Sequence, residues 1–112
     1  MTNIVDIAVQ NDDFRKHLSK GTLVLTRGIR ANTSEDIKKI ITKVRTFEKF
    51  DENNDPYNEH DFGAFDYKGK KIFWKIDYYD REFLYFSPDV SNPKVTNRVL
   101  TCLLYTSDAA DE

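Results

Sequence analysis

The residues best suited to chemistry gather in one polar loop and at the end of a later strand. They are Asp55, Glu59, His60 and Asp61 in the loop, followed by Asp77 and Asp80. Carboxylates with one histidine can bind a hard divalent cation or act as an acid and base pair. Their spacing matches no HExxH motif and no metal-binding loop. We therefore expect no metal site, no cofactor and no catalytic residue.

The loop residues also have a structural interpretation. Asp55 before Pro56 is typical of a turn. Glu59 and Asp61 can accept hydrogen bonds from backbone N–H groups or from an arginine, and His60 would order the loop. The arginines expected for this role are Arg27, Arg81 and Arg98.

Nucleophilic catalysis and phosphate binding lack a motif. No serine lies in a GxSxG turn, His17 lies among charges on an expected helix, and Cys102 belongs to a C-terminal segment discussed below. The four glycines form neither a GxGxxG motif nor a P-loop.

Aromatic and basic residues alternate between positions 68 and 79, an arrangement that can stack nucleic-acid bases. No RNA-binding signature accompanies them, and residues 1–101, with 17 basic and 16 acidic side chains, carry a formal net charge of only +1. We therefore do not expect nucleic-acid binding. A protein interface is the remaining class, because Phe73 and Tyr79 stand amid charges on an outward strand face. The candidate interaction or functional residues are Arg27, Asp55, Tyr57, Glu59, His60, Asp61, Phe73, Lys75, Asp77, Tyr79 and Asp80.

A β-hairpin is the best-defined element. Residues 62–67 and 70–79 are rich in aromatic and β-branched types, and Lys68-Gly69 between them suits a type I′ turn. This turn predicts a register with Tyr67 opposite Lys70, Asp66 opposite Lys71, Phe65 opposite Ile72 and Gly63 opposite Trp74. Ile72, Trp74, Ile76 and Tyr78 should then face the core, with Gly63 leaving room for the indole.

The remaining pattern predicts an α+β domain. We expect helices over about 3–19 and from a Thr33 N-cap to about 47, and short strands over 22–26 and 82–86. Pro93 is expected to begin a last helix. The order α-β-α-β-β-β-α indicates an antiparallel sheet of about four strands with helices packed on one face, forming one domain over residues 1–101.

The C-terminal residues 102–112, CLLYTSDAADE, match the translation of a sequencing-library adapter from end to end. We expect this tail to be non-native. The only cysteine would then carry no information on redox or metal chemistry. The acidic net charge would also not belong to the natural protein, because the tail contains three acidic residues and no Lys or Arg.

Four segments resemble a small bacterial family of unknown function. They are LTRG from Leu25, NDPYNEHDFGAF from Asn54, IFWKIDYYD from Ile72 and the SPD…NP…TNRVLT stretch that ends at Thr101. The resemblance implies no activity. It implies a context, since members often lie on plasmids, phages and other mobile elements among genes for conflict with host defence.

The expected function is that of a small non-enzymatic binding module with a protein partner. The family context indicates a host defence complex as target and an inhibitor of the anti-CRISPR kind. The alternatives are a metal-dependent hydrolase or nuclease centred on residues 55–61, and a nucleic-acid-binding domain that uses the hairpin. We expect a cytoplasmic location and no membrane span, because no apolar run approaches the roughly 20 residues that a span needs.

Overall fold

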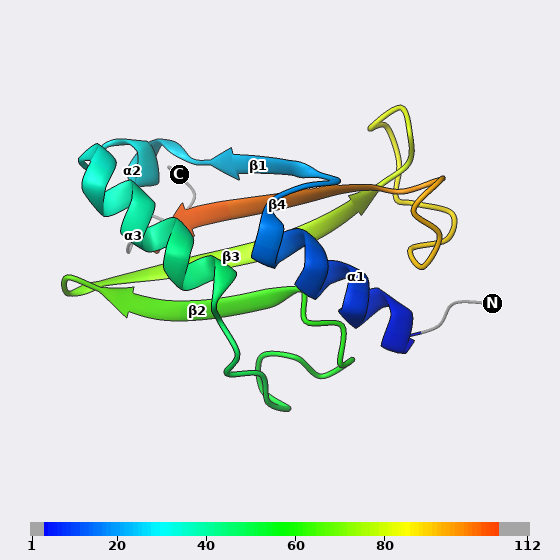
Figure 1. Cartoon of the computed structure of the whole chain (residues 1–112), viewed down its shortest axis with the longest axis horizontal. Coiled ribbons are helices and arrows are strands. Elements are labelled where there is room, and N and C mark those ends of the chain that lie inside the picture. The colour runs from blue at the N-terminus through cyan, green and yellow to red at the C-terminus, as the bar shows by residue number, and fades with distance from the viewer. Residues whose placement is uncertain (1–3, 106–112) are drawn as a thin grey trace.

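The computed structural model describes residues 4–105, and it has the α+β fold that the sequence predicts. Its helices are α1 (Ile4–His17), α2 (Arg27–Arg30) and α3 (Ser34–Arg45). Its strands are β1 (Thr22–Leu25), β2 (Phe62–Tyr67), β3 (Lys70–Tyr79) and β4 (Asn97–Leu104). The strands form one sheet in the order β1-β4-β3-β2, and α1 and α3 lie across the same face of it (Figure 1). Within residues 4–105, no helix has the length and apolar character needed to cross a membrane.

The predicted hairpin is confirmed in register and in turn type. Asp66 pairs with Lys71, Phe65 with Ile72 and Gly63 with Trp74. Lys68 and Gly69 have φ values of 48° and 79°, so both central residues of the turn are left-handed, as a type I′ turn requires. The side chains of Asp66 and Lys71 form an ion pair at 3.7 Å.

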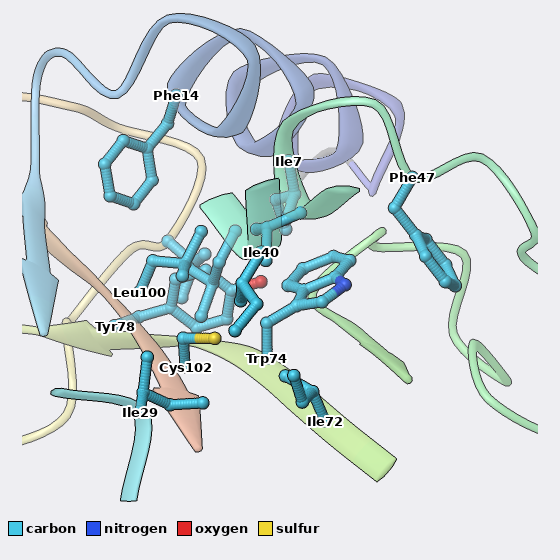
Figure 2. Close-up of a cluster of buried hydrophobic side chains, with 13 residues drawn as sticks. Ile7, Phe14, Ile29, Ile40, Phe47, Ile72, Trp74, Tyr78, Leu100 and Cys102 are labelled. Atoms are coloured by element: carbon cyan, nitrogen blue, oxygen red, sulfur yellow. The ribbon is translucent and has the colours of Figure 1, made fainter. Parts of the chain in front are cut away.

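The core lies between the two long helices and the inner face of the sheet. Trp74 is fully buried, and the other inward side chains of β3 are buried with it. Figure 2 shows Phe14 and Ile7 pointing from α1 toward these strand residues. The core consists of Ile7, Phe14, Ile29, Ile40, Val44, Phe47, Ile72, Trp74, Ile76, Tyr78, Val90, Leu100 and Cys102.

The first turn of α3 is tied to the hairpin. The Thr33 hydroxyl accepts a hydrogen bond from the backbone N–H of Asp36 at 3.1 Å, which is the predicted N-cap. The Asp36 carboxylate accepts a 2.6 Å hydrogen bond from the Tyr67 hydroxyl and pairs with Lys68 at 2.9 Å. The hydrogen bond from Tyr67 and then the one from Lys68 lower the pKa of Asp36 to about 2.

The prediction of a last helix is wrong, because this segment forms β4 in the middle of the sheet. Arg98, Leu100 and Cys102 are buried and the residues between them are less so, an alternation with period two. β4 pairs antiparallel with β3 but parallel with β1, so the sheet is mixed rather than fully antiparallel. Apolar residues on both faces of a central strand hide the alternation and make it resemble a helix.

Two shorter segments also differ from expectation. Residues 82–86 form no strand, and only an isolated bridge joins Phe86 to Tyr79. The Arg27-Gly28 pair begins the short helix α2 rather than simply closing the preceding strand.

The expected domain boundary after Thr101 falls inside β4. Cys102 pairs with Trp74 on one side and with Leu25 on the other, and its side chain is fully buried. The adapter origin of residues 102–112 stays a prediction, and residues 106–112 lie outside the described part of the chain.

Candidate functional site

A pocket of about 440 Å³ opens beside β3 where β2 stops covering it. β2 begins at Phe62, which pairs with Lys75, and the next contact on this side is the hydrogen bond from Ile76 N–H to the Asp61 carbonyl at 2.8 Å. Beyond this point the 57–61 loop and Phe86 form the walls. The pocket is lined by Tyr57, Glu59, Asp61, Ile76, Asp77, Tyr78, Tyr79 and Phe86.

Carboxylates set the electrostatics of this pocket. Burial raises the pKa of Asp61 to about 6, and the nearby negative charges of Glu59, Asp55 and Asp77 raise it as well. The Glu59 carboxylate accepts a 3.0 Å hydrogen bond from the Tyr78 hydroxyl. Asp77 lies 3.6 Å from the Lys75 ammonium in an exposed ion pair. The pocket is therefore negative, and the described lining contains no Lys or Arg.

A buried polar network supports the pocket from behind. The Asn11 side-chain amide donates to the Tyr78 hydroxyl at 2.8 Å and to the Glu59 carbonyl at 2.9 Å. Its oxygen accepts from Arg98 Nε at 2.8 Å, and Arg98 also donates to the Val90 carbonyl. Burial raises the pKa of Tyr78 and lowers the pKa of Arg98. The network fixes the Tyr78 ring and Glu59 relative to the sheet.

The loop itself is held from inside by Asp55. This carboxylate is buried and accepts hydrogen bonds from the backbone N–H groups of Glu59 at 2.9 Å and His60 at 3.1 Å. The His60 ring lies between two carboxylates, 3.0 Å from Asp12 and 3.7 Å from Asp55, and stacks on Phe50 at 4.1 Å between ring centroids. Asp55 and His60 therefore have structural roles, as the turn interpretation expects.

A buried arginine continues this inner cluster. Arg15 is 1% exposed, pairs with Asp12 at 3.0 Å and donates to the Val44 carbonyl at 2.8 Å. Its guanidinium also lies over the rings of Phe50 and Trp74, at 5.4 and 5.1 Å. Arg15 thus links α1 to the end of α3, and Asp12 links Arg15 to His60 of the 55–61 loop.

The segment that was expected to be a strand is an exposed apolar loop. We call residues 83–86, Phe-Leu-Tyr-Phe, the FLYF loop; they follow β3 in the yellow segment of Figure 1. Their exposed fractions are 52%, 70%, 73% and 70%. The Asp80 carboxylate accepts hydrogen bonds from the N–H groups of Leu84 at 2.9 Å and Tyr85 at 3.3 Å. The Asp80 N–H donates to the Tyr85 carbonyl at 2.8 Å, so Asp80 holds the loop through both its side chain and its backbone.

The structure divides the candidate residues among several places. Tyr57, Glu59, Asp61, Asp77 and Tyr79 meet in the pocket. Phe73 lies on the sheet face opposite the core, where its ring packs against Phe62 and Tyr105. Arg27 begins α2 at the other end of the sheet and is exposed (Figure 1). Glu59 is held by a tyrosine hydroxyl and not by an arginine.

Two residues of the site could not be found from the sequence. Phe86 lies in the segment 82–86 that was expected to be a strand, and Asn11 has the same helical spacing as the apolar residues of the first helix. A run of four large apolar residues between charged residues and Ser87-Pro88 could have indicated an exposed loop. The pairing of Asn11 with Arg98 joins residues 87 positions apart, and no local pattern predicts it.

Apart from Ile76, the side chains of the site are aromatic rings and carboxylates. In residues 4–105, no three His, Cys, Asp or Glu side chains form a group that could hold a metal ion.

Comparison with family models gives a match over residues 25–108, to the family described as protein of unknown function (DUF3768). The chain belongs to this family. The match includes everything from the end of β1 through β4, and with it the pocket and the FLYF loop. It confirms the resemblance seen in the sequence. Neither curated proteins nor solved structures gave a match.

Proposed function

We propose that this protein is a non-enzymatic module that binds a protein partner through the FLYF loop and the adjoining pocket. The observation that carries the proposal is the exposure of four consecutive large apolar side chains on a loop fixed by Asp80. Tyr57, which is 71% exposed, adds a further aromatic ring on the other side of the pocket. Exposed apolar patches of this kind are typical of interaction surfaces.

The geometry of the loop favours binding over simple disorder. Phe83 has a φ of 59°, a left-handed conformation that costs a non-glycine residue about 1 kcal/mol or more. The hydrogen bonds of Asp80 hold the chain in that conformation. A loop already fixed in its bound shape loses less conformational entropy when a partner binds.

The target that we propose is a host defence complex, with inhibition by occupation of a binding surface. The support for this choice is the resemblance to a bacterial family whose members often lie on mobile elements. The acidic pocket opposes nucleic acid as the ligand, because phosphates would face Glu59, Asp61 and Asp77.

A small hydrolase is the second candidate, and one observation favours it. The pKa of Asp61 is raised to about 6 within a pocket that also contains Glu59, and such pairs can act as acid and base. If the wild type shows a hydrolytic activity that is lost in an Asp61→Asn variant which still captures a partner, the hydrolase would be favoured over the binding module.

The binding proposal is tested by affinity capture with three forms of the protein. The wild type, a Leu84→Ser/Tyr85→Ser variant and a Val9→Ser control should be expressed in cells that carry defence systems. Val9 is a suitable control because it is 60% exposed on α1. We expect a partner that co-purifies with the wild type and the control but not with the loop variant. A partner retained by the loop variant would contradict the proposal, as would dimerisation of the pure protein through this loop in sedimentation experiments.

A further inference from the structure

We infer that the pocket between Tyr57, Asp77 and Phe86 receives a lysine or arginine side chain of the protein partner. This inference rests on the proposed binding function and adds the chemistry of the partner at one position: a basic residue flanked by apolar ones that contact the FLYF loop.

Aromatic rings form much of the pocket wall. Phe86 packs edge-on against Tyr78, with ring centroids 6.2 Å apart, while Tyr57 and Phe86 remain largely exposed. Tyr78 is fixed by Asn11, and Tyr79, the next residue of β3, also lines the pocket. Ring faces and edges arranged around an opening suit the aliphatic stem of a lysine or the plane of a guanidinium, and they attract the cationic head group.

Carboxylates supply the complementary charge. Glu59, Asp61 and Asp77 line the pocket, and Lys75, the ion-pair partner of Asp77, is not among the lining residues. Burial, and next the repulsion from the neighbouring carboxylates, raise the pKa of Asp61 and make its ionised form unfavourable in the free protein. A bound cation would relieve this repulsion, whereas a phosphate or carboxylate ligand would increase it.

The buried cluster around Arg15 combines the same kinds of groups as the pocket. Arg15 lies over two aromatic rings and pairs with Asp12 in the buried cluster. The pocket offers the same combination of rings and carboxylate at the surface, without an internal arginine to fill it within the described lining. A partner side chain would complete the arrangement.

The test uses peptides in place of the unidentified partner. Acetyl-Gly-Lys-Gly-amide and acetyl-Gly-Arg-Gly-amide are titrated into the ¹⁵N-labelled full chain and followed by NMR. The norleucine peptide, which keeps the apolar stem and lacks the charge, is the control. We expect the cationic peptides to shift the amide signals of Asp61, Asp77 and Phe86, and the norleucine peptide to bind at least about tenfold more weakly.

Charge variants complete the experiment. The double variant Asp61→Asn/Asp77→Asn should weaken binding of the cationic peptides about tenfold, and Asp66→Asn should leave it unchanged. Asp66 is a matched control because its carboxylate is also exposed and paired with a lysine, but on the hairpin turn side of β2. Equal binding of the norleucine peptide, or unchanged binding by the double variant, would overturn the inference.

The two proposals fail in different ways. If a captured partner is lost with the Leu84→Ser/Tyr85→Ser variant but retained by Asp61→Asn/Asp77→Asn, the binding function stands and the cation pocket is wrong. If the loop variant retains the partner, the binding function itself is wrong.

Discussion

Asp61 is the carboxylate whose ionisation the fold shifts most clearly toward the neutral form. Its pKa is about 6 in the folded protein, against an ordinary value of 3.8 for an aspartate, because of burial and the carboxylates around it. Between these two pH values the folded state binds more protons than the unfolded chain. The free energy of unfolding therefore falls as the pH rises from about 4 to about 6.

Asp61→Asn should remove this dependence. At pH 8 we expect the free energy of unfolding of the variant to be about 1 kcal/mol higher than that of the wild type, after allowance for solvent screening of a half-buried group. At pH 4 we expect no difference. Urea unfolding at both pH values measures the difference. A variant that is less stable than the wild type at pH 8 would show that Asp61 is held as a stabilised anion.

Gly63→Ala tests the packing of the core from the neighbouring strand. A Cβ at this position would lie 2.5 Å from Trp74 Nε1 and 2.8 Å from the Phe47 ring. We expect a loss of about 3 kcal/mol in urea unfolding, at the upper end for overpacking. Gly69→Ala is the comparison: it meets no neighbour, and its positive φ should cost only about 1 kcal/mol. Equal losses would show that Trp74 can move aside.

The sequence is informative about residues whose neighbours are set by local register. The position of Gly63 opposite Trp74, where it leaves room for the indole, could be predicted because a type I′ turn fixes every pair in the hairpin. Arg15, Asn11 and Arg98 could not be predicted as buried. Their burial depends on partners from distant elements, and such polar residues are usually exposed.

At the scale of elements, the FLYF loop depends on one carboxylate. Asp80→Ala would remove the acceptor for the Leu84 and Tyr85 N–H groups while leaving the core intact. We expect a loss of about 1–2 kcal/mol in unfolding free energy and faster amide exchange in the loop. Asp80→Asn keeps an acceptor oxygen and should retain most of the protection. Unchanged exchange in Asp80→Ala would mean that the loop needs no such support.

β4 shows why one element was misassigned. Its inward residues include Arg98, whose charge hides the alternation that marks a strand, while Val95 and Val99 have helical spacing. The arginine is tolerated inside because Asn11 and the Val90 carbonyl satisfy it. The hairpin was predictable because its turn and its period agree, whereas β4 pairs with strands remote in sequence and has no such turn.

At the scale of the molecule, the residues that stabilise the fold and the residues proposed to bind a partner lie in different parts of the structure. α1 and α3 cover one face of the sheet (Figure 1), and α1 supplies Asn11 to the polar network behind the pocket. The exposed rings and carboxylates come from the 57–61 loop, the end of β3 and the FLYF loop. Cys102 belongs to the stabilising residues, since it lies fully buried in β4. We expect Cys102→Ser to cost about 1–3 kcal/mol in thermal or urea unfolding, because a hydroxyl would be buried in an apolar site. A smaller loss would indicate that the end of β4 contributes little to the fold.

The measurement that tests the central claim most directly is the dissociation constant of the captured partner for three forms of the protein. Isothermal titration should compare the wild type, Tyr85→Ser and Val9→Ser at equal ionic strength. We predict at least a tenfold weaker complex for Tyr85→Ser, since exposed aromatic residues of an interface often contribute 1–2 kcal/mol or more, and no change for Val9→Ser. Equal dissociation constants for all three forms would contradict the claim that the FLYF loop is the binding surface.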